Sequence, residues 1–218
     1  MKLNIGPGPT AKYFHKLKDW ETLDCEKSRA KSPEMVMEFN KFVKIPRKDD
    51  FYDFVYASHV LEHINQTKTI SFLSEIRRVM RKDAVLRIII PDAKKSMIKF
   101  LNGENFPLFE RRKNRYSSKN HNNKNYVPMT NFEAMRGCFV SISGQQSLHR
   151  QYENSALAHQ NAWDFESIKA DLQRSGFEER NIFKSNYGKS ISGDISYEKL
   201  LDTEARQFDR SLYVEVVK

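Results

Sequence analysis

The opening of the chain constrains the fold most, because an apolar run there stops at a turn containing two glycines. Leu3 to Ile5 are followed directly by Gly6-Pro7-Gly8-Pro9, and residues 10–18 then carry apolar side chains at helical spacing. Glycine lacks a Cβ, so backbone at such a turn can approach a ligand closely. The N–H groups of a following helix point to the same place. This pattern predicts the first strand–turn–helix unit of a nucleotide-binding sheet.

Length and composition favour one globular domain. The chain has 218 residues, of which 39% are hydrophobic and 12% aromatic, enough to bury a sizeable core. No apolar run approaches the roughly 18 residues of a membrane span. Strand-like sequence begins at residue 3, so we expect no secretion leader and a cytoplasmic protein. Cys25 and Cys138 show no CxxC spacing and are expected to be free thiols.

The charge balance leaves two interpretations open. The formal net charge is +9 at pH 7, which suits an anionic partner, but lysine is abundant throughout and can simply coat the surface. The most basic run is Arg111-Arg112-Lys113-Asn114-Arg115. It could recognise a phosphate, a sugar nucleotide or a carboxylate, or be a solvated loop.

Strand-like and helix-like segments alternate along most of the chain. Such alternation predicts an α/β fold with a parallel sheet and helices on both faces. The expected strands are 20–24, 35–39, 51–57, 84–90, 181–187 and 212–217, and the main expected helices are 68–81 and 164–175, with a turn at 81–83.

Residues 97–160 break this alternation. Short helices are expected at 96–101 and 131–140, but residues 111–125 are rich in Lys, Arg, Asn and Ser and read as an exposed loop. We interpret 97–160 as an insert within a single domain of residues 1–218. Another short helix is expected at 197–201.

Several motifs in the right order resemble those of the class I S-adenosylmethionine-dependent methyltransferases, most closely the small generic enzymes known only as predicted methyltransferases. The motifs are Leu3-Asn4-Ile5-Gly6-Pro7-Gly8, then Asp24, then Asp53 through His63, then Glu75 through Asp92, with Gly176-Phe177 and Ser211 through Glu215 near the end. The resemblance covers residues 1–96 and 160–218. It implies a Rossmann-like seven-stranded, mostly parallel sheet whose last strand is antiparallel.

The resemblance implies S-adenosyl-L-methionine as cofactor and assigns residues to it. Asp24 ends the second strand, where one carboxylate can accept hydrogen bonds from both ribose hydroxyls; capping a helix is the alternative for this residue. Glu38 is implied near the adenine amino group, with Asn40 as a rival. The remaining implied positions are Asn4, Gly6, Pro7 and Gly8 at the turn, Phe39 flanking the adenine by backbone and ring, and the backbone of Ser58 and His59 along the methionine part.

The chain departs from the family pattern in two ways. Pro9 stands where a third glycine is usual, which removes an N–H but suits the first turn of a helix. The chain also starts at the first strand, without the N-terminal helices that many relatives fold over their substrate. Any lid is therefore expected to come from 97–160.

One segment has a competing metal interpretation. His59-Val60-Leu61-Glu62-His63 spells H-x-x-E-H, the zinc-ligand spacing of the inverted zincins. Histidines four apart on a helix share a face and can hold one metal ion, with the glutamate as base. A zinc site would need a third ligand, and the methyltransferase resemblance accounts for the segment without metal. We therefore expect no metal, with Glu62 and His63 capping a helix or packing above the sheet, and a zinc metallopeptidase as remote alternative.

Transfer of a methyl group to oxygen or nitrogen calls for a base, and two histidines of the insert are candidates. His159 precedes Ala162-Trp163-Asp164-Phe165, where relatives commonly carry a histidine; His149 is the weaker candidate. The Asn-Pro-Pro-Tyr and Pro-Cys motifs of nucleic-acid methyltransferases are absent. We expect a small-molecule or glycan-like acceptor, which includes anionic ones. The alternatives are a nucleic-acid methyltransferase using loop 111–125 and a cofactor-binding protein without transferase activity.

Overall fold

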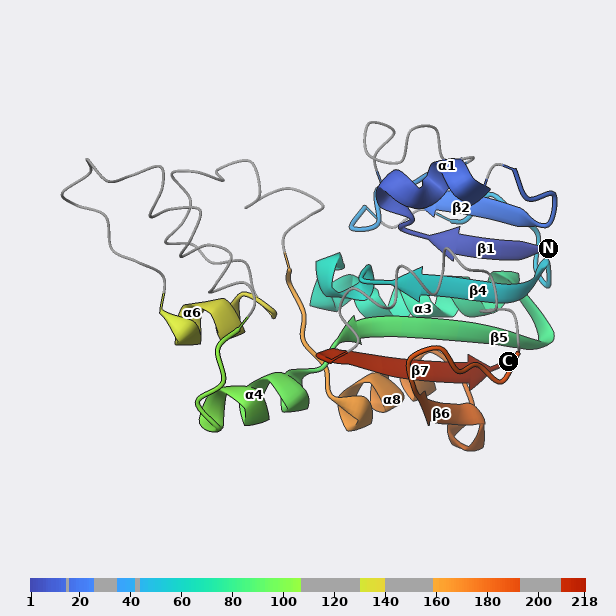
Figure 1. The fold of residues 1–218 in the computed structure, drawn as a ribbon. Helices are drawn as coiled ribbons and strands as arrows, with labels where there is room; N and C mark the ends of the chain where they lie inside the picture. Colours follow the sequence, from blue (N-terminus) through green and yellow to red (C-terminus); the bar gives the residue numbers. More distant parts are fainter. Residues whose placement is uncertain (15, 26–34, 42–43, 107–129, 140–158, 193–208) are drawn as a thin grey trace.

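The computed structural model describes residues 1–14, 16–25, 35–41, 44–106, 130–139, 159–192 and 209–218. Its centre is a seven-stranded sheet with strand order β3-β2-β1-β4-β5-β7-β6 (Figure 1). The strands are β1 Lys2–Ile5, β2 Trp20–Asp24, β3 Met35–Val36, β4 Tyr52–Ser58, β5 Met80–Pro91, β6 Ile182–Ser185 and β7 Ser211–Val217.

The pairing of the strands confirms the expected fold class. β3, β2, β1, β4 and β5 pair in parallel, whereas β7 runs antiparallel to both β5 and β6. The reversed β7 is therefore the antiparallel last strand that the sequence predicts. Because the other strands are parallel, their carboxyl ends meet at one edge of the sheet.

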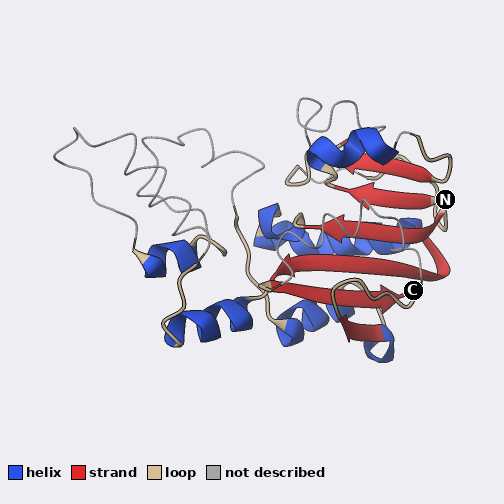
Figure 2. Cartoon of the chain, viewed as in Figure 1, coloured by secondary structure: helices blue, strands red, loops and turns tan. Residues whose placement is uncertain are grey.

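Helices and helical turns connect the strands (Figure 2). They are η1 Gly8–Thr10, α1 Ala11–Phe14, η2 Leu61–His63, α3 Gln66–Val79, α4 Ala93–Leu101, α6 Asn131–Arg136, α8 Phe165–Arg174 and η4 Glu179–Asn181. Both long helices begin at a residue whose side chain accepts a backbone N–H of the first turn: Asn65 caps α3 through Thr67 N, and Asp164 caps α8 through Ser167 N.

Strand residues alternate between two apolar clusters on opposite faces of the sheet, as buried strands do. On one face Leu73 and Ile76 of α3 and Leu172 of α8 pack in the same cluster as Leu86 of β5. The other face holds an aromatic-rich cluster of Phe14, Trp20, Phe54, Tyr56, Val85, Ile89 and Tyr213. Helical residues thus pack on both faces of the sheet, as the alternation of strand-like and helix-like segments predicts.

Several boundaries differ from the expected ones. Helix 10–18 is only a 3₁₀ turn followed by α1, which ends at Phe14, and strand 35–39 is only the two residues of β3. β5 begins at Met80, so the expected turn 81–83 lies inside the strand; Tyr52 pairs with Met80, and the register shifts before Phe54 pairs with Val85. Asp83 takes a φ of 63°. The helix expected at 197–201 lies outside the described residues.

The described parts of the insert lie beyond the carboxyl ends of the parallel strands (Figure 1). α4 and α6 share a third apolar cluster that includes Ala93, Phe106, Met135 and Phe139. Loop 111–125 lies outside the described residues, so the lid role of 97–160 stays a prediction. Both cysteines are free thiols, as expected. No helix in the described ranges is long and apolar enough to cross a membrane.

Candidate functional site

The turn after β1 depends on two glycines in the left-handed region. Gly6 has a φ of +65° and Gly8 a φ of +51°, and Gly6 N donates to Leu23 O of β2 at 2.8 Å. A Cβ on Gly6 would lie 2.3 Å from Val60 Cγ2, whereas a Cβ on Gly8 would meet no atom within 4 Å. Gly6 is thus required by the packing of Val60, and Gly8 borders open space.

Proline fits the helical turn that follows. η1 spans Gly8–Thr10 with Pro7 at its N-cap, and Pro7 O accepts hydrogen bonds from Thr10 N at 3.1 Å and Thr10 Oγ1 at 2.6 Å. Pro9 therefore lies in the first turn, where a missing N–H costs nothing. The replacement of the usual third glycine is compatible with the turn.

Asp24 lies beside this turn at the end of β2. Its side chain is buried, with 5% of the residue exposed, and Oδ2 accepts from Gly8 N at 2.9 Å while Oδ1 accepts from Cys25 N at 2.7 Å. A carboxylate offers about four lone-pair sites, so capacity remains for further donors such as hydroxyls. These two bonds aim the carboxylate at the turn.

Two further predicted positions lie on the neighbouring central strands. Asn4 of β1 is buried and aligns with Thr22 of β2 and Tyr56 of β4. Ser58 closes β4, and its Oγ is buried without a hydrogen-bond partner among the described residues. His59 follows with a φ of 53°, its N–H donating to Ile89 O at 2.8 Å. A buried hydroxyl without a partner is uncommon, and a ligand at this edge would account for it.

The residues that the resemblance implies around the adenine differ from one another in exposure and in hydrogen-bond partners. Glu38 is exposed and pairs with Lys41 at 3.0 Å. The ring of Phe39 is buried against Phe72, with centroids 5.3 Å apart, and its place beside the adenine stays a prediction. Asn40 is engaged by the turn after β4, because its side chain donates to His63 O at 3.2 Å and accepts from Asn65 N at 2.6 Å.

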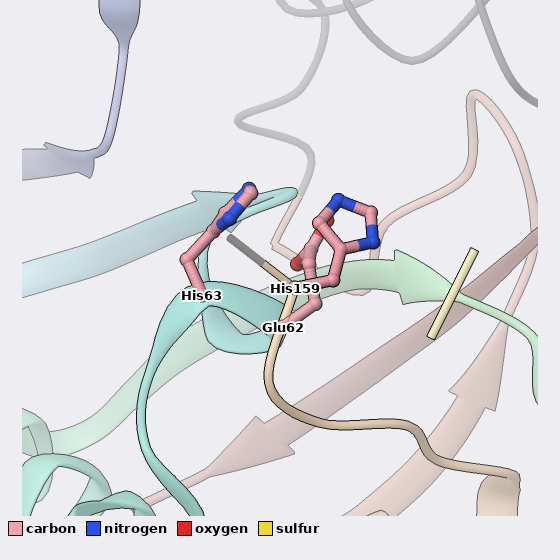
Figure 3. Close-up of side chains that lie close together, drawn as sticks. All are labelled: Glu62, His63 and His159. Atoms are coloured by element: carbon pink, nitrogen blue, oxygen red, sulfur yellow. The ribbon is translucent and has the colours of Figure 1, made fainter. Parts of the chain in front are cut away.

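Beyond β4, three side chains from two distant segments come together. Glu62 and His63 belong to η2, and His159 comes from the segment leading to α8 (Figure 3). A possible ligand atom of each lies within 4.8 Å of those of the other two, and the rings of His63 and His159 meet edge to face at 4.7 Å between centroids. Glu62 is buried, and the two histidines are half-buried.

The neighbours of Glu62 favour its ionised form. Burial raises the pKa of this carboxyl, but the hydrogen bond from His59 Nδ1 at 3.0 Å and the fields of His59, His63 and His159 outweigh it and lower the pKa to about 2. His59 Nε2 lies 3.4 Å from Ser211 Oγ. Glu62 is therefore a carboxylate at neutral pH.

The metallopeptidase alternative fails on local geometry. It requires His59 and His63 on one face of an α-helix, but His59 is in the left-handed region and only Leu61–His63 form a 3₁₀ turn. His63 instead faces His159, a residue that the H-x-x-E-H pattern does not include. His149, the weaker candidate base, lies outside the described residues.

No sequence pattern points to the residues that bring His159 to η2. Glu62 O accepts from Gln160 N at 2.6 Å and from Asn161 N at 3.3 Å. Asn161 Nδ2 donates to Ile64 O at 2.9 Å and to Thr69 Oγ1 at 3.0 Å. These amide side chains are polar loop residues by sequence, and only the three-dimensional path shows that they bind the turn.

Comparisons with known proteins agree with this geometry. Residues 10–88 match a family model described as a methyltransferase domain. This match covers the part of the chain from the turn after β1 to β5, and it agrees with the methyltransferase resemblance of the sequence motifs. An S-adenosylmethionine-dependent methyltransferase from Mesorhizobium loti has the same fold, with a TM-score of 0.53, 12% identity, and coverage of 100% of this chain and 90% of that one.

The plantazolicin methyltransferase BpumL, solved with S-adenosylhomocysteine, gives a TM-score of 0.51 at 12% identity and covers 100% of this chain and 75% of its own. A search of curated proteins found no match. The residues at the sheet edge fit S-adenosyl-L-methionine, the cofactor that the sequence resemblance implies. Gly8 borders open space where backbone can approach a ligand, Asp24 offers a buried acceptor for ribose hydroxyls, and Ser58 Oγ has no hydrogen-bond partner among the described residues.

Proposed function

We propose that the protein methylates an oxygen or nitrogen of a small-molecule or glycan-like acceptor at the carboxyl edge of β1, β2 and β4. The observation that carries the proposal is that Gly8, Asp24 and Ser58 all border this edge and that His159 lies at the turn directly after β4. Ligands of open α/β sheets bind outside the carboxyl ends of the strands.

In this proposal the turn and three strand ends hold the cofactor. Asp24 accepts from the ribose, the backbone of Gly6, Pro7 and Gly8 approaches it closely, and Asn4 supports the strand beneath. Glu38 and the backbone of Phe39 flank the adenine, and Ser58 and His59 line the methionine part. S-adenosylmethionine supplies a methyl group on a sulfonium sulfur, which is already a strong electrophile. The protein has mainly to orient the acceptor and remove its proton.

His159 is the proposed proton acceptor. Its Nδ1 lies 3.0 Å from Cys138 O, and a carbonyl oxygen only accepts, so Nδ1 carries the hydrogen. In the neutral ring the lone pair is then on Nε2, the atom that can take a proton from an acceptor. The ring is half-buried, so part of it remains exposed.

Calorimetry with S-adenosylmethionine and S-adenosylhomocysteine tests cofactor binding, and an acceptor screen with methyl-labelled cofactor tests transfer. We expect micromolar or tighter binding of both, and label in a hydroxyl- or amine-bearing small molecule or saccharide. Binding of neither ligand would refute the proposal. Tight binding with no turnover on a broad panel would indicate a cofactor-binding protein without transferase activity.

His159→Ala tests the proposed base once an acceptor is known. We expect kcat to fall by about 10²–10⁴-fold with little change in cofactor affinity, the usual contribution of general acid–base catalysis. Unchanged kcat would remove His159 from the mechanism.

The net charge of +9 supports nucleic acid as a second acceptor class. Binding of RNA or DNA that weakens steeply between about 50 and 200 mM salt, as binding through phosphate contacts does, would favour it together with label transfer to the nucleic acid. No binding at low salt would exclude it.

A further inference from the structure

We propose that Glu62, His63 and His159 form a binding site for a divalent transition-metal ion of the zinc, manganese or cobalt type. Its catalytic role rests on the proposed function, but its existence does not. Two imidazoles and one carboxylate are a ligand set for such ions, and three protein ligands leave a position open for substrate or water. The three possible ligand atoms already lie within 4.8 Å of one another.

The first supporting observation is the carboxylate of Glu62. Its side chain is 1% exposed, Oε1 is held by His59 Nδ1 at 3.0 Å, and Oε2 is buried with no hydrogen-bond partner among the described residues. A buried, charged oxygen without a partner is costly. A cation between Glu62 and the two histidines would satisfy that oxygen.

The second observation is the state of His159. Its Nδ1–H donates to Cys138 O at 3.0 Å, which fixes the tautomer with the lone pair on Nε2. A histidine that binds a metal commonly donates its other ring N–H to a carbonyl or carboxylate. His59 orients the carboxylate of Glu62 in the same way, through its Nδ1. Its other ring nitrogen, Nε2, lies close to Ser211 Oγ.

Third, the two segments that supply the ligands are held together by hydrogen bonds around the site. Gln160 N and Asn161 N both donate to Glu62 O, and Gln160 Nε2 donates to His63 O at 3.2 Å. Asn161 also binds Ile64 O at 2.9 Å. His159 is therefore kept beside η2 across almost a hundred residues of sequence.

The site needs only a small adjustment to bind an ion. Zinc–ligand distances of about 2.0–2.2 Å place neighbouring ligand atoms about 3–4 Å apart. The ligand atoms, now within 4.8 Å of one another, can come closer by rotation of the half-buried His63 ring while His159 keeps its hydrogen bond to Cys138 O.

The position of the ion defines the acceptor class. It would lie above the end of β4, at the edge where the acceptor is proposed to bind. A hydroxyl bound at the open position would have a lower pKa and lose its proton to water, leaving an oxygen nucleophile for methyl transfer. We therefore infer an acceptor whose methylated position is a hydroxyl group. Nε2 of His159 would then be a ligand, not the base.

The test is a metal titration of full-length protein without a histidine tag, after dialysis against a chelator. Co²⁺ is followed by its visible absorption, and Zn²⁺ and Mn²⁺ by calorimetry. We expect one equivalent to bind saturably, with a cobalt spectrum of a nitrogen–oxygen site and a rise in Tm. No saturable binding of any of the three ions would overturn the proposal.

Variants then assign the site. His63→Gln and His159→Gln change half-buried side chains. Each is expected to weaken metal binding by at least about 10-fold, because loss of a residue that only hydrogen-bonds a metal ligand already costs about that much. Asp53→Asn, at the opposite end of β4, is the matched control and should bind the metal as wild type does. Circular dichroism checks that the variants are folded. Binding that persists in both histidine variants is binding elsewhere on the protein and overturns the proposal.

Cofactor titration of the same metal-free protein separates this proposal from the proposed function. If S-adenosylmethionine binds and no metal does, the metal site is wrong and the methyltransferase proposal stands. If metal binds and the cofactor does not, the reverse holds. If both bind, turnover that is lost with chelator and restored by the ion supports the catalytic role, and turnover unaffected by chelator overturns that role.

Discussion

Arg87 of β5 and Glu215 of β7 form an ion pair in which both side chains are buried. Their side chains are 0% and 1% exposed, and Arg87 Nη1 lies 3.2 Å from Glu215 Oε1. Arg87 also donates to Lys189 O at 2.7 Å and Asn186 O at 2.9 Å, and Glu215 accepts from Ile191 N at 3.0 Å. The pair therefore joins the antiparallel β7 to the parallel part of the sheet and to the loop after β6.

Removing one member of this pair should destabilise the fold strongly. Arg87→Leu leaves Glu215 buried and without its cation, and such changes cost about 3–5 kcal/mol. The double variant Arg87→Leu/Glu215→Leu removes both charges and should recover part of that loss. Urea unfolding of the wild type and the three variants, including Glu215→Leu, measures both effects. A single variant within about 1 kcal/mol of wild type would contradict the prediction, since surface pairs contribute no more than that.

The stability of the protein should also depend on pH through Glu21. Burial raises the pKa of this carboxyl, but hydrogen bonds from Arg47 and Tyr52 and the charge of Arg47 outweigh it, so the folded-state pKa is lower than usual. A lowered pKa stabilises the fold above the unfolded pKa of about 4.3, and this contribution is lost as the pH falls through the folded value.

Glu21→Gln should therefore be less stable than wild type at pH 6, and the difference should shrink as the pH falls below about 4.3. Urea unfolding at several pH values between these limits measures the difference directly. A stability difference that stays constant with pH would show that Glu21 does not contribute through its charge.

The sequence predicts those elements that depend on local pattern. β2 matches its expected span, 20–24, because its apolar side chains end at Asp24, and α8 starts at its cap, Asp164. The sequence pattern places the start of β5 at residue 84 rather than at Met80, because Met80 joins the sheet only through its pairing with Tyr52. The contact between Glu62 and His159 is beyond local pattern altogether, since it depends on the path of the whole insert and on the hydrogen bonds of Gln160 and Asn161.

Gly6→Ala should be costly because of Val60. Any residue other than glycine is strained at a φ of +65°, by roughly 1–2 kcal/mol, and the new Cβ would also lie 2.3 Å from Val60 Cγ2. Gly103→Ala is the matched control, with a φ of +74° and no atom within 4 Å of the added Cβ. We expect Gly6→Ala to lower the free energy of unfolding more than this control does.

Val60→Ala removes the atom that clashes, so it should offset the extra cost when combined with Gly6→Ala. The strain would remain, and the double variant should resemble Gly103→Ala once the cost of Val60→Ala itself is subtracted. A strictly additive result in this double-mutant cycle would mean that Val60 is not what excludes a side chain at Gly6.

Asp24→Asn should weaken cofactor binding more than it weakens the fold. Both carboxylate oxygens accept backbone N–H groups, from Gly8 and Cys25, and an amide can replace only one of them while presenting its NH₂ to the other donor. The negative charge offered to the ribose hydroxyls is also lost. Hydrogen bonds to charged groups contribute about 1.5–3 kcal/mol, so the affinity for S-adenosylmethionine should fall by about 10–100-fold.

Calorimetry measures the affinity of this variant, and Asp53→Asn at the amino end of β4 serves as control for removal of one negative charge. Unfolding measurements on the same samples separate a weakened turn from a lost ligand contact. If Asp24→Asn unfolds more easily yet binds S-adenosylmethionine and S-adenosylhomocysteine as wild type does, Asp24 serves only to hold the turn at Gly8. The ribose would then have to be held by other residues.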